Sequence, residues 1–200
     1  MLPAAAILLL VLAEPAAAPT ATAAAPPASA CSLLTGEELA ATQGSELAEA
    51  NATALVRDGL AVSRCFFRTR DLARSVSLEL TRVDAAIPDR DAVRHRWQSM
   101  FHGQAEVGER EREASHREGD AEEAKEHGEE AGEPEGKPEP VAGLGDEAFW
   151  LGTGTFGVLY VLEDQAFLRL SVGGPGDREA KLGQSRALAK KALARLAGGR

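Results

Sequence analysis

Residues 156–172 read FGVLYVLEDQAFLRLSV, and this stretch decides the fold class. Two apolar runs, residues 156–162 and 166–172, lie on either side of a polar turn at residues 163–165. Apolar runs of this length joined by a short polar turn are typical of a β-hairpin. We therefore expect two antiparallel strands here, with the surrounding elements packed against the sheet that they form.

A helix is expected soon after this hairpin. Residues 173–176, GGPG, interrupt the strand pattern, and Asp177 is a good N-cap for a helix that ends near Ala197. One side of the expected helix is apolar, and its last turns are basic, which suits the negative end of a helix dipole. The apolar positions are Leu182, Ala189, Leu193 and Leu196, and the basic ones are Lys190, Lys191 and Arg195.

A glycine-rich stretch precedes the hairpin and follows a strand expected at residues 148–151. Residues 152–157 read GTGTFG and match the nucleotide-binding pattern Gly-x-Gly-x-x-Gly by letter. A dinucleotide-binding loop leads into a helix, and a kinase loop is accompanied by further motifs, whereas here a strand is expected next and those motifs are absent. We interpret residues 152–157 as a turn between two strands.

The N-terminal part of the expected domain begins with a helix. Thr35 and Glu38 have the spacing of a capping box, in which each side chain binds the backbone N–H of the other residue. Gly44 is a C-terminal stop signal. The sequence therefore predicts a helix over residues 36–43.

Two strands are expected after this helix, at residues 60–68 and 75–83. In the second one, Val76, Leu78 and Leu80 alternate with polar residues. This alternation with a period of two is typical of a half-buried strand.

A second helix is expected over residues 88–102, with Pro88 in its first turn and Gly103 after its end. We interpret its apolar stripe as core packing, with a partner-binding face as the alternative. The stripe consists of Val93, Trp97, Met100 and Phe101. His95 and His102 are about 10 Å apart along such a helix, too far to share a metal ion, so we expect both at the surface.

These elements together predict an α+β fold, with a mainly antiparallel sheet packed by helices. Residues 31–104 and 140–197 are expected to form one domain, interrupted by an insertion at residues 105–139. Residues 105–140 contain 14 acidic and five basic residues, and the rest of the chain contains 17 of each sign. The insertion region therefore carries the whole formal net charge of −9.

The acidic insertion has no apolar face with which to pack, because Val107 is its only large aliphatic residue and no aromatic residue occurs in it. We therefore expect it to be disordered. The oxygen-ligand pattern of a calcium loop is absent, so we expect no dedicated metal site, although His116 and His127 lie among the carboxylates.

The N-terminal residues have the composition of a targeting segment. Residues 2–13 read LPAAAILLLVLA, an apolar run shorter than the roughly 20 residues that span a membrane and of the length found in signal peptides. We expect a signal peptide at residues 1–18, an Ala/Pro linker at residues 19–30, and export to the periplasm or the extracellular space. Because no Lys or Arg precedes Arg57, an uncleaved N-terminus that tethers the protein to a membrane is the alternative.

Cys31 and Cys65 are the only cysteines. An oxidising compartment outside the cytoplasm favours a disulfide between them. Two alternatives stay open, namely two separate thiols and a lipid attached to Cys31. A lipidated cysteine should directly follow the apolar core of the signal peptide, and here the Pro-rich residues 14–30 intervene.

Three short motifs stand out, Cys31-Ser32-Leu33-Leu34-Thr35 with Glu38, Cys65-Phe66-Phe67, and Gly143-Leu144-Gly145-Asp146-Glu147-Ala148-Phe149-Trp150. Together they resemble a family of small exported bacterial proteins of unknown function, many of them lipoproteins. The resemblance covers roughly residues 31–104 and 140–197, and the acidic insertion is no part of it. It implies that the two cysteines pair, and it transfers no catalytic residue.

No catalytic motif is visible. The chain lacks Gly-x-Ser-x-Gly, His-Glu-x-x-His and Cys-x-x-Cys, so we expect neither an enzyme nor a cofactor. The net charge of −9 argues against a nucleic-acid partner, and no apolar run is long enough for an integral membrane span. We expect an exported, non-catalytic, monomeric domain of the cell envelope that binds a partner protein or a small ligand. The alternatives are a structural spacer and an enzyme without a recognisable motif.

Overall fold

The computed structural model describes residues 29–86, 89–103, 137–153 and 156–198. The predicted signal peptide, nearly all of the predicted linker and the acidic insertion as far as residue 136 lie outside these ranges. Within the described ranges, no helix combines the length and the hydrophobicity needed to cross a membrane.

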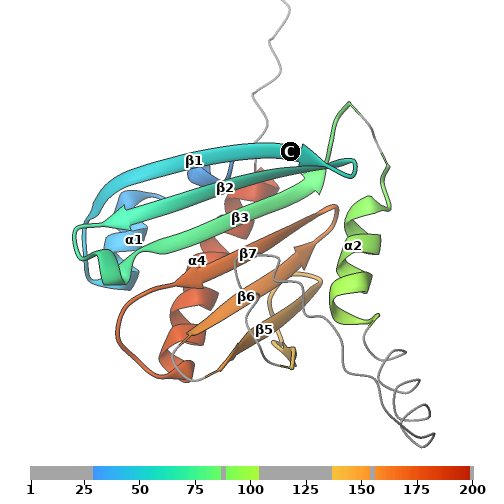
Figure 1. The fold of residues 1–200 in the computed structure, drawn as a ribbon. Coiled ribbons are helices and arrows are strands. Elements are labelled where there is room, and N and C mark those ends of the chain that lie inside the picture. Colours follow the sequence, from blue (N-terminus) through green and yellow to red (C-terminus); the bar gives the residue numbers. More distant parts are fainter. Residues whose placement is uncertain (1–28, 87–88, 104–136, 154–155, 199–200) are drawn as a thin grey trace, which may run out of the picture.

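Seven strands of the described residues form one sheet, and every neighbouring pair is antiparallel (Figure 1). The predicted α+β class is therefore confirmed. Because β3 pairs with β7, strands on both sides of residues 104–136 belong to the same sheet. In their order across the sheet the strands are β1 (Leu47–Arg57), β2 (Leu60–Thr69), β3 (Val76–Val83), β7 (Ala166–Val172), β6 (Phe156–Glu163), β5 (Glu147–Thr153) and β4 (Glu139–Pro140).

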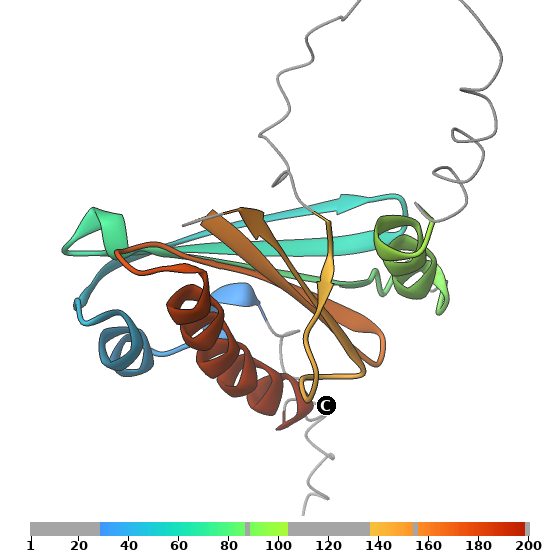
Figure 2. The same cartoon turned by 90° about the horizontal axis from the view of Figure 1, so that it is seen from below.

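The helices of the described residues pack on both faces of this sheet. They are α1 (Gly36–Gln43), α2 (Ala92–Phe101) and α4 (Arg178–Gly198), with short 3₁₀ turns η1 (Ala30–Ser32) and η2 (Leu72–Arg74). Helices α1 and α4 contact each other and cover one face (Figure 2). Helix α2 packs at one end of the opposite face, and no other helix of the described residues lies on that face.

The helix caps agree with the sequence prediction. The Glu38 N–H donates to the Thr35 hydroxyl at 3.3 Å, and the Thr35 N–H donates to the Glu38 carboxylate at 3.0 Å. Gly44 ends α1 in the left-handed region with a φ of 66°. At the start of α4, the Ala180 N–H donates to Asp177 Oδ1 at 2.9 Å, as expected for an N-cap.

Two apolar cores lie on opposite faces of the sheet. The larger one lies between the sheet and the α1/α4 pair, and the smaller one lies between the sheet and α2. The apolar stripe predicted on α2 packs in the smaller core, as the core-packing interpretation required. The largest fully buried side chains of the larger core include Leu33, Leu39, Phe67, Leu78, Leu80, Trp150, Leu159, Leu168, Leu170 and Leu188. The smaller core contains Leu60, Val93, Trp97, Val158, Tyr160, Leu162 and Phe167.

Cys31 and Cys65 form a disulfide, with their Cα atoms 5.0 Å apart. The bond connects η1 to the middle of β2 within the larger core. The structure thus contains the cysteine pairing that the sequence favoured. Within the described residues no free cysteine is left.

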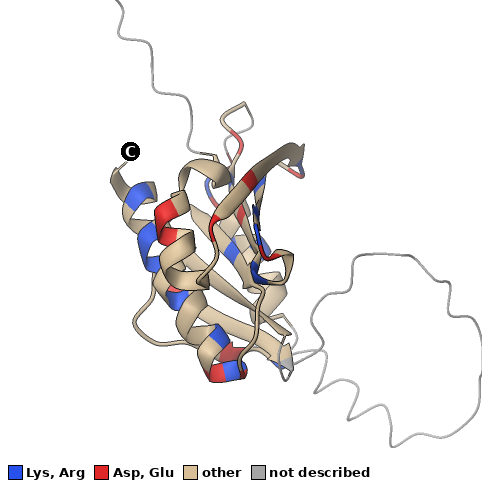
Figure 3. Ribbon diagram, turned by 90° about the vertical axis from the view of Figure 1, so that its left-hand side faces the viewer, with Lys and Arg blue, Asp and Glu red and all other residues tan. Residues whose placement is uncertain are grey.

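Oppositely charged side chains connect α1 and α4. Figure 3 marks the acidic positions red and the basic positions blue on the ribbon. The Arg195 guanidinium donates to both oxygens of Glu38, at 2.7 and 2.9 Å, and also to the Leu33 carbonyl at 2.9 Å. Lys191 approaches the same carboxylate to 3.6 Å. These contacts join the first helix of the domain to the last.

Several boundaries differ from the sequence prediction. The long edge strand β1 was not predicted, and the short strand β4 includes Glu139, which the prediction assigned to the acidic insertion. Helix α2 begins at Ala92 rather than at Pro88, and Pro88 itself lies outside the described residues.

Gly152 and Gly157 belong to a β-hairpin, as predicted, because they lie in β5 and β6, which pair antiparallel; residues 154–155 lie outside the described residues. Gly152 pairs with Gly157 across the hairpin. A Cβ atom on Gly157 would lie 1.9 Å from Cζ2 of Trp150, so only glycine leaves room for the buried indole here. Gly157 thus has a packing role.

Candidate functional site

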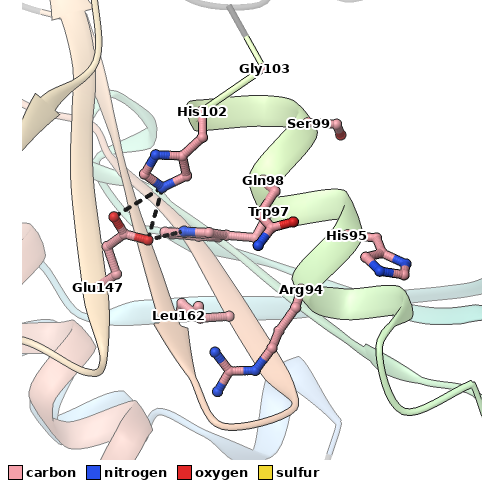
Figure 4. A pocket seen from close by; sticks show the side chains of 9 residues that line it. All are labelled: Arg94, His95, Trp97, Gln98, Ser99, His102, Gly103, Glu147 and Leu162. Carbon is pink, nitrogen blue, oxygen red and sulfur yellow. Dashed lines mark hydrogen bonds and ion pairs between the residues drawn. The ribbon is translucent and has the colours of Figure 1, made fainter. Parts of the chain in front are cut away.

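An open depression lies between α2 and the first residue of β5 (Figure 4). Its volume is about 650 Å³. Most of its lining comes from one helix, and the rest comes from strands that follow much later in the sequence. The lining residues are Arg94, His95, Trp97, Gln98, Ser99, His102 and Gly103 from α2 and its C-terminal end, and Glu147 and Leu162 from β5 and β6.

The backbone before β5 places Glu147 on one wall of this depression. Gly145 has a φ of 61°, and a Cβ atom there would lie 2.3 Å from the Leu162 carbonyl oxygen. Only glycine fits this position, because it alone tolerates both the conformation and the close approach. The Asp146 N–H donates to the Leu162 oxygen at 2.8 Å, and Glu147 then pairs with Leu162 across the β5–β6 ladder.

The carboxylate of Glu147 holds α2 against the sheet. The indole N–H of Trp97 donates to Glu147 Oε2 at 2.5 Å. Trp97 is only 2% exposed, so this bond satisfies a donor that would otherwise be buried without a partner. The first residue of β5 thus accepts the hydrogen bond of the buried indole N–H in the middle of α2.

His102, which caps the C-terminus of α2, reaches the same carboxylate. Its Nε2 lies 3.0 Å from Glu147 Oε1 and 3.2 Å from Oε2, and its side chain is 50% exposed. Its ring also meets Phe149 edge-on, with 5.9 Å between the ring centroids. In Figure 4 the imidazole and the carboxylate face each other beside the Trp97 indole.

An aromatic cluster forms the floor behind these polar groups. Phe101 packs against Trp97 at 4.4 Å, stacks on Phe149 at 4.7 Å and meets Tyr160 edge-on at 5.2 Å between centroids. Rings packed on several sides in this way have few rotamers available to them. The polar side chains of the depression are therefore held in place by the tightly packed aromatic residues behind them.

Nitrogen donors dominate the open side of the depression. Arg94 is about half exposed, and its guanidinium approaches the Asp146 carboxylate only to 3.9 Å. His95 and Gln98 are exposed along the same helix. Glu147 already accepts a hydrogen bond from Trp97 and contacts His102. The side chains left to meet a ligand thus carry mainly N–H groups.

Among the described residues, the depression contains part of a catalytic arrangement but no nucleophile in reach of it. His102 and Glu147 have the geometry of a base and the group that orients it. The hydroxyl at the rim, Ser99, donates instead to the Arg96 carbonyl at 2.8 Å and extends from another side of the helix (Figure 4). Nor do three or more His, Cys, Asp or Glu side chains of the described residues come together as a metal site. The described side chains of the depression thus offer N–H donors, one carboxylate and an apolar edge to a ligand.

The sequence indicated only the helical half of this site. Trp97 and His102 were expected on one helix, Trp97 in the core and His102 at the surface, and both expectations are confirmed. Glu147 was noticed only as part of the Gly143–Trp150 motif. The predicted disulfide, Cys31 with Cys65, belongs to the larger core on the opposite face of the sheet and takes no part in the depression.

Comparison with known proteins does not extend this description: no protein family, no curated protein and no solved structure matches the chain. The resemblance to small exported bacterial proteins therefore stays a prediction from the sequence motifs.

Proposed function

We propose that the protein is an exported, non-catalytic binding domain of the cell envelope, and that the depression between α2 and β5 is its binding site. The ligand is a small carboxylate, or a carboxylate side chain of a partner protein. Export is supported by the apolar N-terminal run and by the disulfide, which suits an oxidising compartment.

The proposal rests on one observation: the carboxylate of the depression has close partners, whereas its guanidinium has only a distant one. Glu147 is occupied by Trp97 and His102, at 2.5 and 3.0 Å. Arg94 has an acidic neighbour only at 3.9 Å and keeps most of its donors for another group. A guanidinium binds a carboxylate through two parallel N–H···O bonds, which makes arginine the natural anchor for such a ligand.

The neighbouring side chains suit the same ligand. Gln98, about one helical turn after Arg94, adds an N–H donor, and Leu162 and the edge of Trp97 offer apolar contact in the same depression. A ligand with one carboxylate and a short apolar part would use both kinds of surface. An open site of this shape, with few groups to bury the ligand, corresponds to modest affinity.

We would test this proposal by titrating the ¹⁵N-labelled chain with succinate and with ethylammonium while following the backbone amides by NMR. Succinate should produce saturable shifts at residues 94–103 and 145–148, and ethylammonium should not. The variant Arg94→Gln should weaken succinate binding at least tenfold. Its matched control is Arg96→Gln, an exposed arginine of the same helix that does not line the depression.

Either of two results would exclude the site. One is the absence of saturable shifts with succinate up to about 10 mM, tenfold above a Kd of about 1 mM, which corresponds to about −4 kcal/mol. The other is an equal response of the Arg94→Gln and Arg96→Gln variants.

A further inference from the structure

Strand β1 is a long sheet edge with no partner on its outer side among the described residues. Every residue from Ala48 to Arg57 is exposed, including Leu55 at 45% and Val56 at 59%. Sheet edges in soluble proteins are commonly protected by central charges, by proline or by bulges, because an open edge pairs readily with another chain. In β1 the pairing with β2 shifts register between Leu47 and Glu49, at the start of the strand, and continues regularly to Arg57.

The regularly paired part of β1 has none of the features that protect a sheet edge. Residues 50–56 read ANATALV, without charge, proline or glycine. The two charged residues lie at the ends, Glu49 at the first regular position and Arg57 at the last. The midpoint between them is Thr53.

The turn after β1 determines which backbone groups point outward. Asp58 and Gly59 form a two-residue loop with φ values of 53° and 73°, so Arg57 and Leu60, which flank it, form a hydrogen-bonded pair. Hydrogen-bonded pairs then recur at every second residue of β1, and the N–H and C=O groups of the residues between them point away from β2. These outward residues are Ala50, Ala52, Ala54 and Val56.

We propose that β1 pairs with β1 of a second copy of this chain, antiparallel and with Thr53 on the two-fold axis, to form a homodimer with one continuous sheet. In this register Ala52 faces Ala54 of the second copy and Ala50 faces Val56, so outward groups meet outward groups and complete the hydrogen bonds. If the two-fold axis lay between two residues of β1, residues with outward backbone groups would face residues of the second copy whose groups point toward β2. The outward N–H and C=O groups would then stay unpaired.

The charges select this register from the others that satisfy the hydrogen bonds. With Thr53 on the axis, Glu49 of each copy faces Arg57 of the other, on the same side of the sheet. An axis at Ala52 would set Arg57 opposite Leu47, and an axis at Ala54 would set it opposite Asn51, so both ion pairs would be lost. Glu49 already holds Arg68 of its own chain at 3.0 Å, which positions its carboxylate on that face.

A cysteine at the axis tests the register. Opposite Cα atoms in a non-hydrogen-bonded pair are about 4.5 Å apart, within the range of a disulfide. The full-length Thr53→Cys variant should therefore cross-link into a covalent dimer under mild oxidation. Residue 53 projects from the face opposite Cys65, which pairs with Ala52, so the native disulfide is undisturbed. The matched control is Asn51→Cys. In this register the two copies of residue 51 in the dimer would lie roughly 13 Å apart, so this variant should run as a monomer on a non-reducing gel.

The ion pairs are tested by exchanging the charges of residues 49 and 57 and measuring the dimer dissociation constant by sedimentation equilibrium. Arg57→Glu should weaken dimerisation at least tenfold, and the double variant Glu49→Arg with Arg57→Glu should restore the affinity to within about threefold of the original chain, because it re-forms both pairs. Circular dichroism melting shows that each variant is folded.

Three results would overturn the proposal. The first is an unmodified chain that stays monomeric at all concentrations up to about 1 mM, the weak limit of specific association. The second is equal cross-linking of the Thr53→Cys and Asn51→Cys variants. The third is a double charge exchange that fails to recover what Arg57→Glu loses.

Discussion

Glu38 connects local helix capping to long-range packing in a single side chain. It completes the capping box with Thr35 and accepts two hydrogen bonds from Arg195, and its side chain is only 17% exposed. The Arg195 hydrogen bonds lower the pKa of this carboxyl to about 2, against the opposing effect of burial, and the Thr35 N–H adds to the lowering. The charged form is therefore the one that the fold stabilises.

Stability should depend on the charge of Glu38 in acid. The carboxyl has a lower pKa in the folded than in the unfolded chain, so its contribution is full above about pH 5 and is lost as the pH falls toward 2. Glu38→Gln should reduce the free energy of unfolding by about 2 kcal/mol at pH 7, and about half of that difference should disappear by pH 3. Urea unfolding curves from pH 7 to pH 3 measure it.

The control for this series is Glu37→Gln, an exposed position on the same helix turn. It should leave stability nearly unchanged over the whole pH range. A Glu38→Gln deficit of the same size at pH 7 and pH 3 would mean that the lost packing, and not the charge, causes the effect.

Lys181 is a residue whose burial the sequence did not predict. Only Leu182 next to it was assigned to the apolar side of the last helix, yet Lys181 is 2% exposed. Its ammonium donates to the carbonyls of Val172, the last residue of β7, and of Gly174 in the following glycine loop, and burial lowers its pKa. A lysine that satisfies loop carbonyls from within a helix depends on the path of that loop, which periodicity does not report.

Elements marked by cap residues or by a bounded apolar run were predicted from the sequence, and the element without such a mark was missed. Helix α1 has the predicted bounds because its cap residues mark them. Strand β7 has them because its apolar run, buried on both faces of the sheet, lies between a polar turn and a glycine stretch. Strand β1 has ten exposed residues out of 11, so it has no burial pattern to find. The one usable signal was the Asp58-Gly59 pair, which is typical of a tight hairpin turn and implies a strand on each side of it.

The disulfide links two elements that also contact each other directly, since the Ala30 N–H donates to the Ser63 hydroxyl at 3.0 Å. Cys31 lies in η1, at the start of the described chain, and Cys65 lies in β2, 34 residues later. In the chain-entropy model, closing a loop of this size stabilises the folded state by about 3 to 4 kcal/mol. The effect acts mainly on the unfolded chain, so the elements should keep their arrangement when the bond is absent.

The double variant Cys31→Ser with Cys65→Ser should accordingly lose about 3 kcal/mol of unfolding free energy and keep its far-ultraviolet circular dichroism. Adding a reductant to the unmodified chain should cause a similar loss, and adding it to the double variant should cause none. Identical unfolding curves for the oxidised and reduced unmodified chain would contradict a stabilising bond.

The depression is formed by residues far apart in the sequence, so only its helical half, on α2, could be predicted from the sequence. Trp97 and His102 lie on one helix, where a 3.6-residue period separates a buried residue from an exposed one. Their shared partner Glu147 lies 50 positions after Trp97 and beyond the acidic insertion. No local pattern connects positions so far apart, and only the sheet order brings them together.

The two halves of the chain, residues 29–103 and 137–198, should behave as one cooperative unit. Seven register pairs join β3 to β7 in the middle of the sheet, Arg195 binds Glu38, and α2 of the first half packs on β5 and β6 of the second. Neither half can bury its part of either core alone, because both cores contain residues from both halves. Thermal unfolding should therefore show a single transition.

Cutting the chain between the halves tests this directly. A site for a specific protease placed within residues 104–136 allows cleavage after folding, and both cysteines lie in the first half, so no covalent bond then joins the two. The cleaved halves should elute together in gel filtration at neutral pH and separate only in denaturant, since β3–β7 pairing and both cores lie outside the cut. Uncleaved chain carrying the same site is the control. Halves that separate without denaturant, or an intact chain that unfolds in two steps, would show that the sheet does not unite them, and the depression formed by α2 and β5 would then lack its framework.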